Sequence, residues 1–285
     1  MTLNQAVCIV TGSAAGIGAA CAERLAAKGA RVAINYTKSE REARDVAAAC
    51  ESKGSETIVV RADVSSDQDC RRLAAAALDK WGRIDALVNN AGTTKFARHD
   101  DLDALQAEDF QRIFGVNVIG AFQMVRAVAP AMQKQGRGAV VNVSSVAGIM
   151  GVGSSVAYAA SKGALNTMTL SLARALGPVI RVNAVCPGFV ETRWLKTGLG
   201  AAYESVKQNY EANTPLRATA LPENVADAVV WLLEGADKIT GELITVDSAP
   251  APRACAMIMV RCNGARSQPA AGFCRGSFTT AIQQR

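Results

Sequence analysis

The chain has 285 residues, of which 49% are hydrophobic and 20% charged, a composition typical of a globular protein with a substantial core. No apolar run reaches the ~18 residues that a membrane helix needs, and the N-terminus lacks the basic and apolar regions of a secretory signal. We therefore expect a cytoplasmic protein that does not interact with membranes.

The positive charge of the chain is concentrated near its C-terminus. The formal net charge is +6, but residues 248–285 contain five Arg and no Lys, Asp or Glu. Residues 1–247 hold 26 basic and 25 acidic side chains, so their net charge is only +1. A nearly neutral body argues against nucleic-acid binding. We predict one domain over residues 1–247 and an atypical basic tail over 248–285, loosely ordered.

Cysteine and histidine usage argues against a metal site. The eight Cys form no CxxC pair, and the first five fall inside predicted strands and helices, where they act as small apolar residues in a reducing compartment. His99 is the single histidine. We predict no metal site and no disulfide.

From residue 6 onward, short β-branched runs alternate with longer Ala-rich stretches of helical character. Gly29 and Gly54 stand where helices end, and Ser66 stands where one begins. Residues 192–215 are predicted to be a long, less regular segment. The predicted strands are 6–10, 30–35, 57–60, 84–88, 139–143, 180–185 and 243–246, and the predicted helices are 16–28, 39–53, 66–80, 105–134, 158–176 and 222–233.

This alternation predicts an α/β fold. Continuously apolar strands separated by helices indicate a parallel sheet covered on both faces. Right-handed crossovers then give a doubly wound, seven-stranded Rossmann fold in a single domain, with ligands bound beyond the carboxyl ends of the strands.

A glycine-rich turn follows the first predicted strand, in residues 12–18. Its glycines permit a tight turn and a close approach to a pyrophosphate, and the helix that begins there offers free N–H groups. The spacing Gly-x-x-x-Gly-x-Gly differs from the Gly-x-Gly-x-x-Gly fingerprint, but the position between first strand and first helix favours dinucleotide binding. The predicted contacts are Gly12, Ser13, Ala15, Gly16, Ile17 and Gly18.

Tyr158 and Lys162 lie four residues apart on a predicted helix and therefore share one face. A free tyrosine has a pKa of about 10, and a cation close to it can lower that value by roughly 1–3 units. The pair is a candidate acid/base, although the same spacing also occurs on helix surfaces without any function.

Further motifs follow the later strands, and they occur in a fixed order along the chain. After the glycine turn they are Asn89-Asn90-Ala91-Gly92, Asn117, Ser144-Ser145, Tyr158-x-x-x-Lys162 and Pro187-Gly188. With this set, residues 6–247 resemble the short-chain dehydrogenase/reductase family, and in particular members of the 3-oxoacyl-[acyl-carrier-protein] reductase type.

The resemblance implies roles for four residues. Tyr158 would be the general acid in ketone reduction or the base in alcohol oxidation. Lys162 would lower the pKa of Tyr158 and bind the nicotinamide ribose. Ser145 would bind the substrate oxygen, and it is preferred to Ser144 because the family's serine lies thirteen residues before its tyrosine. Asn117 would hold a water that links Lys162 to solvent.

The resemblance also implies a nicotinamide cofactor. An acid at the end of the second strand would bind the ribose 2′-hydroxyl of NAD, but that position is Tyr36. Thr37 and Lys38 follow it and would hold a 2′-phosphate, which favours NADP, with NAD still possible. Ala15 stands where many NADP-preferring members have a basic residue, which weakens this preference.

Asp63 and Val64 are predicted to contact the adenine, although an Asp that caps a turn explains the first of them equally well. The other predicted cofactor contacts are Asn90, Ala91, Gly92, Tyr158, Lys162, Pro187, Gly188, Val190 and Thr192.

We therefore predict an NAD(P)-dependent oxidoreductase that transfers a hydride between nicotinamide and a carbonyl or secondary alcohol, in the direction of NADPH-dependent ketone reduction. The partner would be a small carbonyl or alcohol compound, and the chain would form a homo-oligomer, either a dimer or a tetramer. One alternative is a reductase of 3-oxoacyl thioesters on an acyl carrier protein. Two further alternatives are a non-catalytic nucleotide-binding regulatory protein and an enzyme made defective by its unusual tail.

Overall fold

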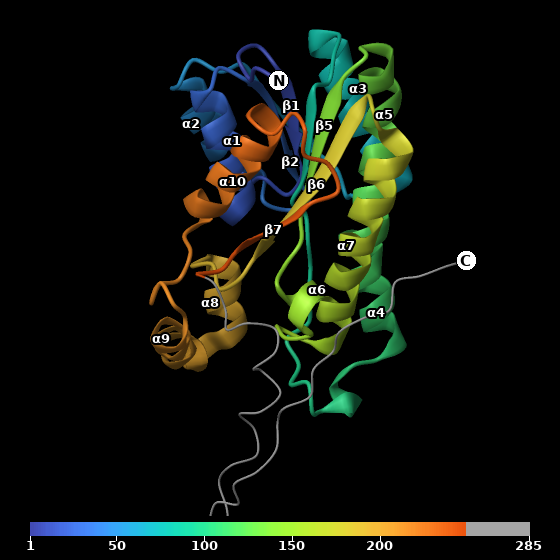
Figure 1. Ribbon diagram of the computed structural model, residues 1–285. Coiled ribbons are helices and arrows are strands. Elements are labelled where there is room, and N and C mark those ends of the chain that lie inside the picture. Colours follow the sequence, from blue (N-terminus) through green and yellow to red (C-terminus); the bar gives the residue numbers. More distant parts are fainter. Residues whose placement is uncertain (249–285) are drawn as a thin grey trace, which may run out of the picture. The chain divides into compact units, whose positions relative to one another are not determined.

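A computed structural model of the chain describes residues 1–248. Its centre is a seven-stranded, entirely parallel sheet with the strand order β3-β2-β1-β4-β5-β6-β7 (Figure 1). The predicted α/β doubly wound fold is therefore confirmed, whereas the predicted tail lies outside the described residues, apart from Ser248. The strands are β1 (Val7–Val10), β2 (Arg31–Tyr36), β3 (Thr57–Arg61), β4 (Ala86–Asn89), β5 (Gly138–Val143), β6 (Ile180–Pro187) and β7 (Leu243–Val246).

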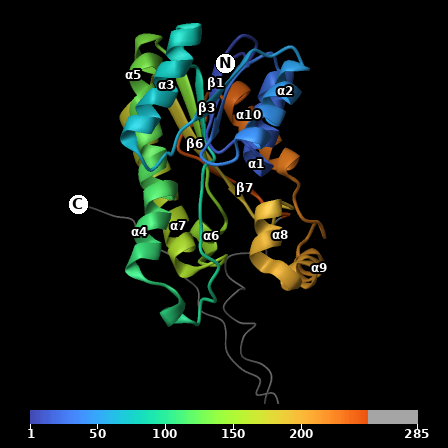
Figure 2. The ribbon, with the colours of Figure 1, turned by 180° about the vertical axis from the view of Figure 1, so that it is seen from behind.

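Helices cover both faces of this sheet (Figures 1 and 2). One layer consists of α1 (Gly16–Ala27), α2 (Glu40–Glu51) and α10 (Pro222–Glu234). The opposite layer consists of α3 (Asp67–Trp81), α5 (Ala121–Lys134) and α7 (Val156–Leu176).

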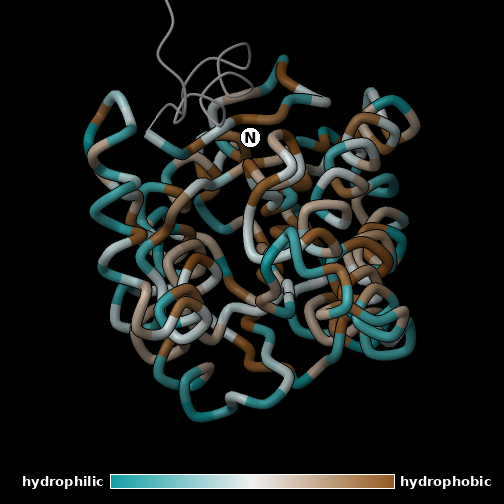
Figure 3. Tube along the Cα trace, turned by 90° about the horizontal axis from the view of Figure 1, so that it is seen from below, coloured by the Kyte–Doolittle hydropathy of each residue, from teal (hydrophilic) through white to brown (hydrophobic). Residues whose placement is uncertain are grey.

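The strands are apolar throughout because each face packs against a helix layer. Val10 belongs to the core on the α1 side, while its neighbour Ile9 belongs to the core on the α5 side. Both are completely buried, and each such side chain stabilises the fold by about 1.5–3 kcal/mol. In Figure 3 the hydrophobic segments accordingly gather in the interior, and hydrophilic segments lie mostly at the periphery.

One continuous helical stretch, residues 107–134, is long and apolar enough to span a membrane by length and composition alone. Within it, Met124, Val128 and Met132 are completely buried against the sheet. Core helices of soluble proteins meet the same criteria, and the packing of this stretch is that of a core helix.

The direction in which strands are added changes between β1 and β4. Val10 of β1 pairs with Ile34 of β2 on one side and with Val88 of β4 on the other. Doubly wound sheets bind their ligands at this topological switch point, beyond the carboxyl ends of the strands. The glycine turn follows β1 there, and the Asn89–Gly92 segment follows β4.

Two segments differ from their predicted secondary structure. The segment 192–215, predicted to be irregular, contains helix α8 (Arg193–Leu199), the 3₁₀ turn η3 (Gly200–Ala202) and helix α9 (Tyr203–Asn213). The predicted helix over 105–134 is observed over 107–134, with one π-helical turn inside it. Three glycines in 188–200 obscured the helical pattern there, since glycine disfavours helix interiors.

The region before β5 consists of several helical pieces. It contains the 3₁₀ turn η1 (Leu102–Ala104), α4 (Ala107–Phe114), the π-helical turn η2 (Gly115–Gly120) and α5. A short helix, α6 (Ala147–Met150), that was not predicted follows β5. Helices α6, α8 and α9 all lie beyond the carboxyl ends of the strands (Figure 1).

Candidate active site

The glycine turn after β1 can be formed only by glycine at two of its positions. Gly12 has a φ of +61°, and a Cβ on it would lie 2.9 Å from the Cα of Ala91. A Cβ on Gly18 would overlap the side-chain amide of Asn90. The turn is therefore packed directly against the segment that follows β4.

Two asparagines, buried Asn35 and partly buried Asn90, fix the shape of this turn. Asn35 accepts a hydrogen bond from the Gly12 N–H (3.0 Å) through Oδ1 and donates to the carbonyl of Ala62 (3.0 Å) through Nδ2. Asn90 donates from Nδ2 to the carbonyls of Thr11 (2.9 Å) and Gly12 (3.0 Å). Side chains from β2 and from the β4 loop thus hold the turn between them.

The residues of the turn fit a dinucleotide. The N-cap of α1, Ala15, supplies no side-chain acceptor, so the first N–H groups of the helix remain available to an anion. A Cβ on Gly16 would meet only Thr192, at 3.5 Å, which brings the loop after β6 next to the turn. A pyrophosphate would lie between these two segments, at the positive end of the α1 dipole.

Tyr158 and Ser145 meet at the carboxyl end of β5. Tyr158 lies in the first turn of α7, where Ser155 caps the helix by accepting a hydrogen bond from the Tyr158 N–H (3.2 Å). Burial raises the pKa of Tyr158 to about 12, and a side-chain hydrogen bond with Ser145 acts in the opposite direction. This differs from the expected lowering by Lys162, because desolvation disfavours the phenolate. The phenol is therefore protonated at neutral pH.

Lys162 lies one helical turn further along α7 and is only 4% exposed. Its Nζ donates to the carbonyl of Val143 (2.8 Å) and lies 5.7 Å from the centre of the Tyr158 ring. Burial lowers its pKa to about 8, so the ammonium group loses its proton close to neutral pH. The amine lies beside the ring of Tyr158, and the tyrosine and the lysine share one face of α7, as predicted.

Asn117 lies in the π-helical turn, a rare conformation that is frequent at functional sites. Its Nδ2 donates to the Thr93 carbonyl and to Ser161 Oγ, both at 3.0 Å, and its Oδ1 accepts from the Thr93 N–H at 2.8 Å. Both amide hydrogens are therefore used to tie the β4 loop to α7. A water of the predicted kind would have to bind the remaining lone pair of Oδ1 or the backbone carbonyl.

The two adjacent serines have different surroundings. Ser144 Oγ donates to Asn166 Oδ1 (2.6 Å) and to the Lys162 carbonyl (3.2 Å), inside the interface between β5 and α7. Ser145 Oγ accepts from the Ala147 N–H (3.1 Å) and interacts with Tyr158. Only the second serine contacts the phenol.

A polar cavity of about 510 Å³ lies beyond the ends of β2 and β3. Thr37, Lys38 and Arg61 contribute donors to its lining, and Asp63 is also part of it. The Oδ1 of Asp63 accepts from the N–H (2.9 Å) and the hydroxyl (2.7 Å) of Ser65, so it caps a turn. The cavity lies at the same carboxyl edge of the sheet as the glycine turn.

Tyr36 does not point freely into this cavity. A side-chain hydrogen bond joins it to Glu40, and burial together with that carboxylate raises the pKa of Tyr36. Glu40 is also bound by Arg44, at 2.6 and 3.0 Å. This carboxylate near the end of β2 is therefore neutralised by its own helix.

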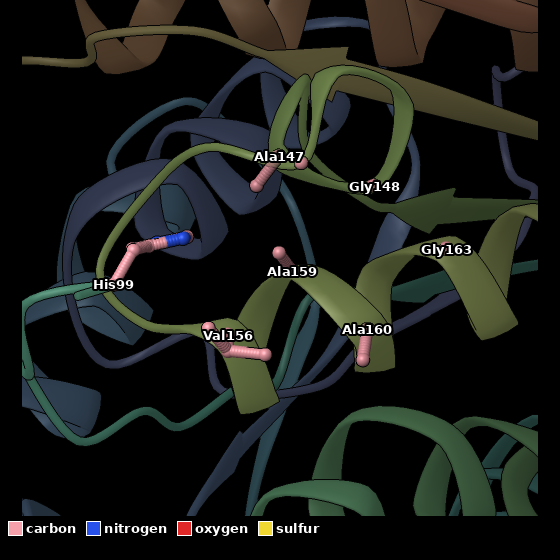
Figure 4. Close-up of a pocket in the computed structure, with 8 residues that line it drawn as sticks. His99, Ala147, Gly148, Val156, Ala159, Ala160 and Gly163 are labelled. Carbon is pink, nitrogen blue, oxygen red and sulfur yellow. The ribbon is translucent and has the colours of Figure 1, made fainter. Parts of the chain in front are cut away.

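A second cavity, of about 370 Å³, lies between α6 and α7 (Figure 4). It is lined by the α7 face that carries Val156, Ala160 and Gly163, together with His99, whose Nε2 lies 3.1 Å from the Gly153 carbonyl. Neither Tyr158 nor Lys162 lines it. This cavity is separate from the candidate catalytic groups.

Helices α8 and α9 form a cap next to the site. The N-cap of α8 is Thr192, whose hydroxyl accepts from the Leu195 N–H (3.3 Å). Helix α9 is anchored through Tyr210, which donates to the Asp247 carbonyl (2.6 Å) and packs on Phe189, with 5.6 Å between ring centroids. Gly188 allows this contact, since a Cβ there would lie 2.5 Å from Asp247 Cβ.

Among the remaining predicted cofactor residues, Pro187 ends β6 and its carbonyl lies 3.4 Å from Ser145 Oγ. Val190 forms an isolated bridge with Ala220, and Gly92 is exposed between Asn117 Oδ1 and Lys162 Nζ. The predicted residues thus come from segments that follow the strands at the carboxyl edge of the sheet. Within residues 1–248, no cluster of three His, Cys, Asp or Glu side chains could hold a metal ion.

Some residues of the site had not been predicted. Asn35 carried a signal, because it is a polar residue at the end of an apolar strand run. Thr11 also binds the β4 loop, accepting from the N–H groups of Asn90 and Ala91, both at 3.0 Å. Phe96 contacts Trp194, and Arg61 lines the polar cavity beyond β2 and β3. No motif in the sequence around either residue predicts these positions.

Comparisons with known proteins agree with this geometry. The family model described as enoyl-(acyl carrier protein) reductase matches residues 12–248. A relative named as a ketoacyl reductase of the granaticin polyketide synthase, from Streptomyces violaceoruber, is 44% identical over 241 residues, 85% of this chain and 94% of the relative. A 3-oxoacyl-[acyl-carrier-protein] reductase from Synechocystis is 38% identical over 248 residues, 86% of this chain and 96% of the relative.

A solved structure is similar over the same region. It is a 7α-hydroxysteroid dehydrogenase complexed with NADH and 7-oxo glycochenodeoxycholic acid, with a TM-score of 0.80 and 30% identity over 87% of this chain and 96% of that one. The fold, the glycine turn and these relatives lead to one conclusion. The chain belongs to the short-chain dehydrogenase/reductase family and is an NAD(P)-dependent oxidoreductase that acts on carbonyl and alcohol groups.

Proposed function

We propose that this enzyme reduces ketones with NADPH and that Tyr158 supplies the proton. The observation that carries the assignment of the acid is the environment of Tyr158: burial raises the pKa of the phenol to about 12, and its side chain is hydrogen-bonded to Ser145. A group that holds its proton at neutral pH is prepared to act as an acid, and reduction of a carbonyl needs an acid.

The residues divide the chemistry among them. When bound, the cofactor supplies the hydride that reaches the carbonyl carbon. Tyr158 gives its phenolic proton to the carbonyl oxygen, and Ser145 Oγ donates a hydrogen bond to the same oxygen as charge develops on it. The ammonium of Lys162, beside the Tyr158 ring, stabilises the resulting phenolate and binds the ribose. Asn117 positions the β4 loop next to this lysine.

Preference for NADP rests on the polar cavity beyond β2. Lys38 and Arg61 supply two positive charges there, Thr37 supplies a hydroxyl, and Glu40 is neutralised by Arg44. A 2′-phosphate would bind these cations through charge-assisted hydrogen bonds. The alternative is NAD, the cofactor that the hydroxysteroid dehydrogenase complex contains in reduced form.

A second substrate class is a 3-oxoacyl thioester, which the names of the two relatives favour. Its carbonyl would be reduced with the help of Tyr158, Ser145 and Lys162, while its carrier protein would remain outside the active site. Two exposed basic residues on α8 would bind a carrier phosphate there: Lys196, and Arg193, which pairs with Glu42 (3.5 Å).

We also propose that the chain is cytoplasmic and forms a homo-oligomer. The described part exposes the large apolar side chains of Ile119, Phe122 and Leu170, by 53%, 41% and 36%. Such side chains indicate an interface where they gather in one patch, and η2, which carries Ile119, packs against α7, which carries Leu170. Light scattering of the purified chain would distinguish a monomer from a dimer or tetramer.

The proposal is tested with purified full-length protein, NADPH or NADH, and a panel of ketones, β-ketoesters and 3-oxoacyl thioesters. We expect NADPH consumption with at least one ketone and a higher kcat/KM with NADPH than with NADH. Binding of NADPH without consumption on any substrate would favour a non-catalytic nucleotide-binding protein instead.

A further inference from the structure

Three aromatic rings from three separate segments contact one another in sequence, and one of them is the ring of Tyr158. Trp194 of α8 is in the middle, with its ring centroid 6.1 Å from that of Tyr158 and 5.6 Å from that of Phe96. Both contacts are tilted, at 46° and 55°, an arrangement that is favourable for aromatic pairs. The indole therefore forms a wall next to the proton donor.

Phe96 holds this wall in position, and Gly198 makes room for it. A Cβ on Gly198 would overlap the Phe96 ring, so the ring fits against α8 only because position 198 has no side chain. The loop that carries Phe96 is fixed from behind by Ser154, which accepts from the Ala97 N–H (2.9 Å) and shares a hydrogen bond with Thr94 Oγ1 (2.7 Å).

The indole retains a large free surface. Trp194 is 46% exposed although it contacts two other rings, and its Nε1 has no hydrogen-bond partner within residues 1–248. A tryptophan held by two neighbouring rings offers a rigid, flat, apolar contact area at a small cost in conformational entropy. Its free surface is available to whatever approaches Tyr158.

We propose that Trp194 is the specificity-determining residue of the carbonyl site, and that the substrate carries a flat, apolar ring next to the carbonyl group that Tyr158 protonates. This inference rests on the proposed function. A rigid flat ring loses no rotamer freedom when it packs on the indole, whereas an aliphatic chain does. Aromatic pairs also gain stability beyond the apolar area that they bury.

The test compares 2-tetralone with 2-decalone, two bicyclic ketones of similar size, because only the first contains a flat ring. For the wild type and each variant, the ratio of kcat/KM for 2-tetralone to that for 2-decalone is measured with saturating NADPH. We expect Trp194→Leu to lower this ratio about 3- to 10-fold, the range that aromatic pairing contributes. Trp194→Phe retains a ring and should keep most of the preference.

The support of the wall is tested with Gly198→Ala, which should lower the ratio by displacing Phe96. In a Phe96→Ala background the same change should have no further effect, because the overlapping ring is gone. Thr197→Ala is the matched control, since Thr197 is exposed on α8 next to Gly198. NADPH affinity and melting temperature, measured for every variant, show that the fold and the cofactor site are intact.

The outcomes separate the two proposals. A wild type that reduces both ketones, with a ratio that Trp194→Leu leaves within twofold, overturns the role of Trp194 and leaves the proposed function standing. An equal loss in Thr197→Ala overturns it too. A wild type that binds NADPH but reduces neither these ketones nor the wider panel overturns the proposed function itself.

Discussion

The cofactor end and the substrate end of the candidate site are stabilised by different kinds of interaction. At the cofactor end, Asn35, Asn90 and Thr11 fix the glycine turn through hydrogen bonds of 2.9–3.0 Å between three strands and their loops. At the substrate end, α8 meets the rest of the site through tilted ring contacts at 5.6 and 6.1 Å, with Trp194 half exposed.

This difference corresponds to what each end must bind. The cofactor is the same in every reaction, so a turn with fixed donors and no spare space is suited to its pyrophosphate and ribose. The substrate end depends on contacts between rings, which are not directional, so it selects by shape and apolar surface and not by fixed donors. We therefore expect substitutions at the cofactor end to affect all substrates alike and substitutions on α8 to affect substrates selectively.

The largest effect is expected where the two ends meet, at Tyr158. Tyr158→Phe removes the phenolic proton while keeping the ring on which Trp194 packs. General acid catalysis contributes about 10²- to 10⁴-fold, so kcat for ketone reduction should fall by that factor. The NADPH dissociation constant, measured by fluorescence titration, should stay within about twofold. Unchanged turnover in this variant would contradict the assignment of the acid.

The next largest effect is expected in the glycine turn. Gly12→Ala combines a left-handed φ of +61° with a Cβ 2.9 Å from Ala91, so the turn must shift. A displacement of this kind can lower the rate of a positioned reaction about 10²-fold. We therefore expect weaker NADPH binding and a loss of rate with every substrate tested.

Gly82→Ala is the matched control for this change. Gly82 has a similar φ of +71°, but nothing lies within 4 Å of the added Cβ. It should cost about 1–3 kcal/mol of stability, visible in thermal unfolding, and leave NADPH affinity unchanged. Equal loss of affinity in both variants would show that backbone strain, and not the contact with Ala91, is responsible.

The pH dependence of reduction should report on Lys162. Its pKa is lowered to about 8 by burial, so the ammonium is present below that value and is lost as the pH rises through it. Tyr158 remains protonated throughout this window. We expect kcat/KM to decrease up to tenfold per pH unit above about pH 8. A rate that stays constant to pH 10 would indicate that the charge of Lys162 is not required.

The smallest effect is expected at the outer end of the cofactor site. Lys38→Ala should weaken NADPH binding about tenfold, since a hydrogen bond to a charged group contributes about 1.5–3 kcal/mol. The affinity for NADH should not change, because NADH lacks the 2′-phosphate. Lys134→Ala, an exposed lysine at the end of α5, is the control. Equal losses for both cofactors would place the phosphate elsewhere.

The fold was predictable because its signals are local. Apolar strand runs, Ser66 as a helix cap and glycines at helix ends specify the alternation of strands and helices, and chirality rules then specify the sheet. Helices α8 and α9 were missed because glycines interrupt a short pattern, and their position depends on contacts such as Tyr210 with Asp247, 37 residues away.

The shared helix face of Tyr158 and Lys162 was predictable from their spacing, but the pKa of Tyr158 was not. Tyr158 and Lys162 share a helix face as their spacing requires. The pKa of Tyr158 moves upward, however, because burial outweighs the effect of the neighbouring cation, and burial depends on tertiary packing. The contact of Phe96 with Gly198 joins the loop after β4 to helix α8, which no local pattern indicates.

The central claim is that hydride passes between nicotinamide and a substrate carbonyl beside Tyr158. The most direct measurement uses NADPH deuterated at both C4 positions, the full-length protein and 2-tetralone, with mass spectrometry of the product. We predict an alcohol that carries one deuterium at the former carbonyl carbon, formed by the wild type and nearly absent with Tyr158→Phe. Tight binding of the labelled cofactor with no label in any product would contradict the account.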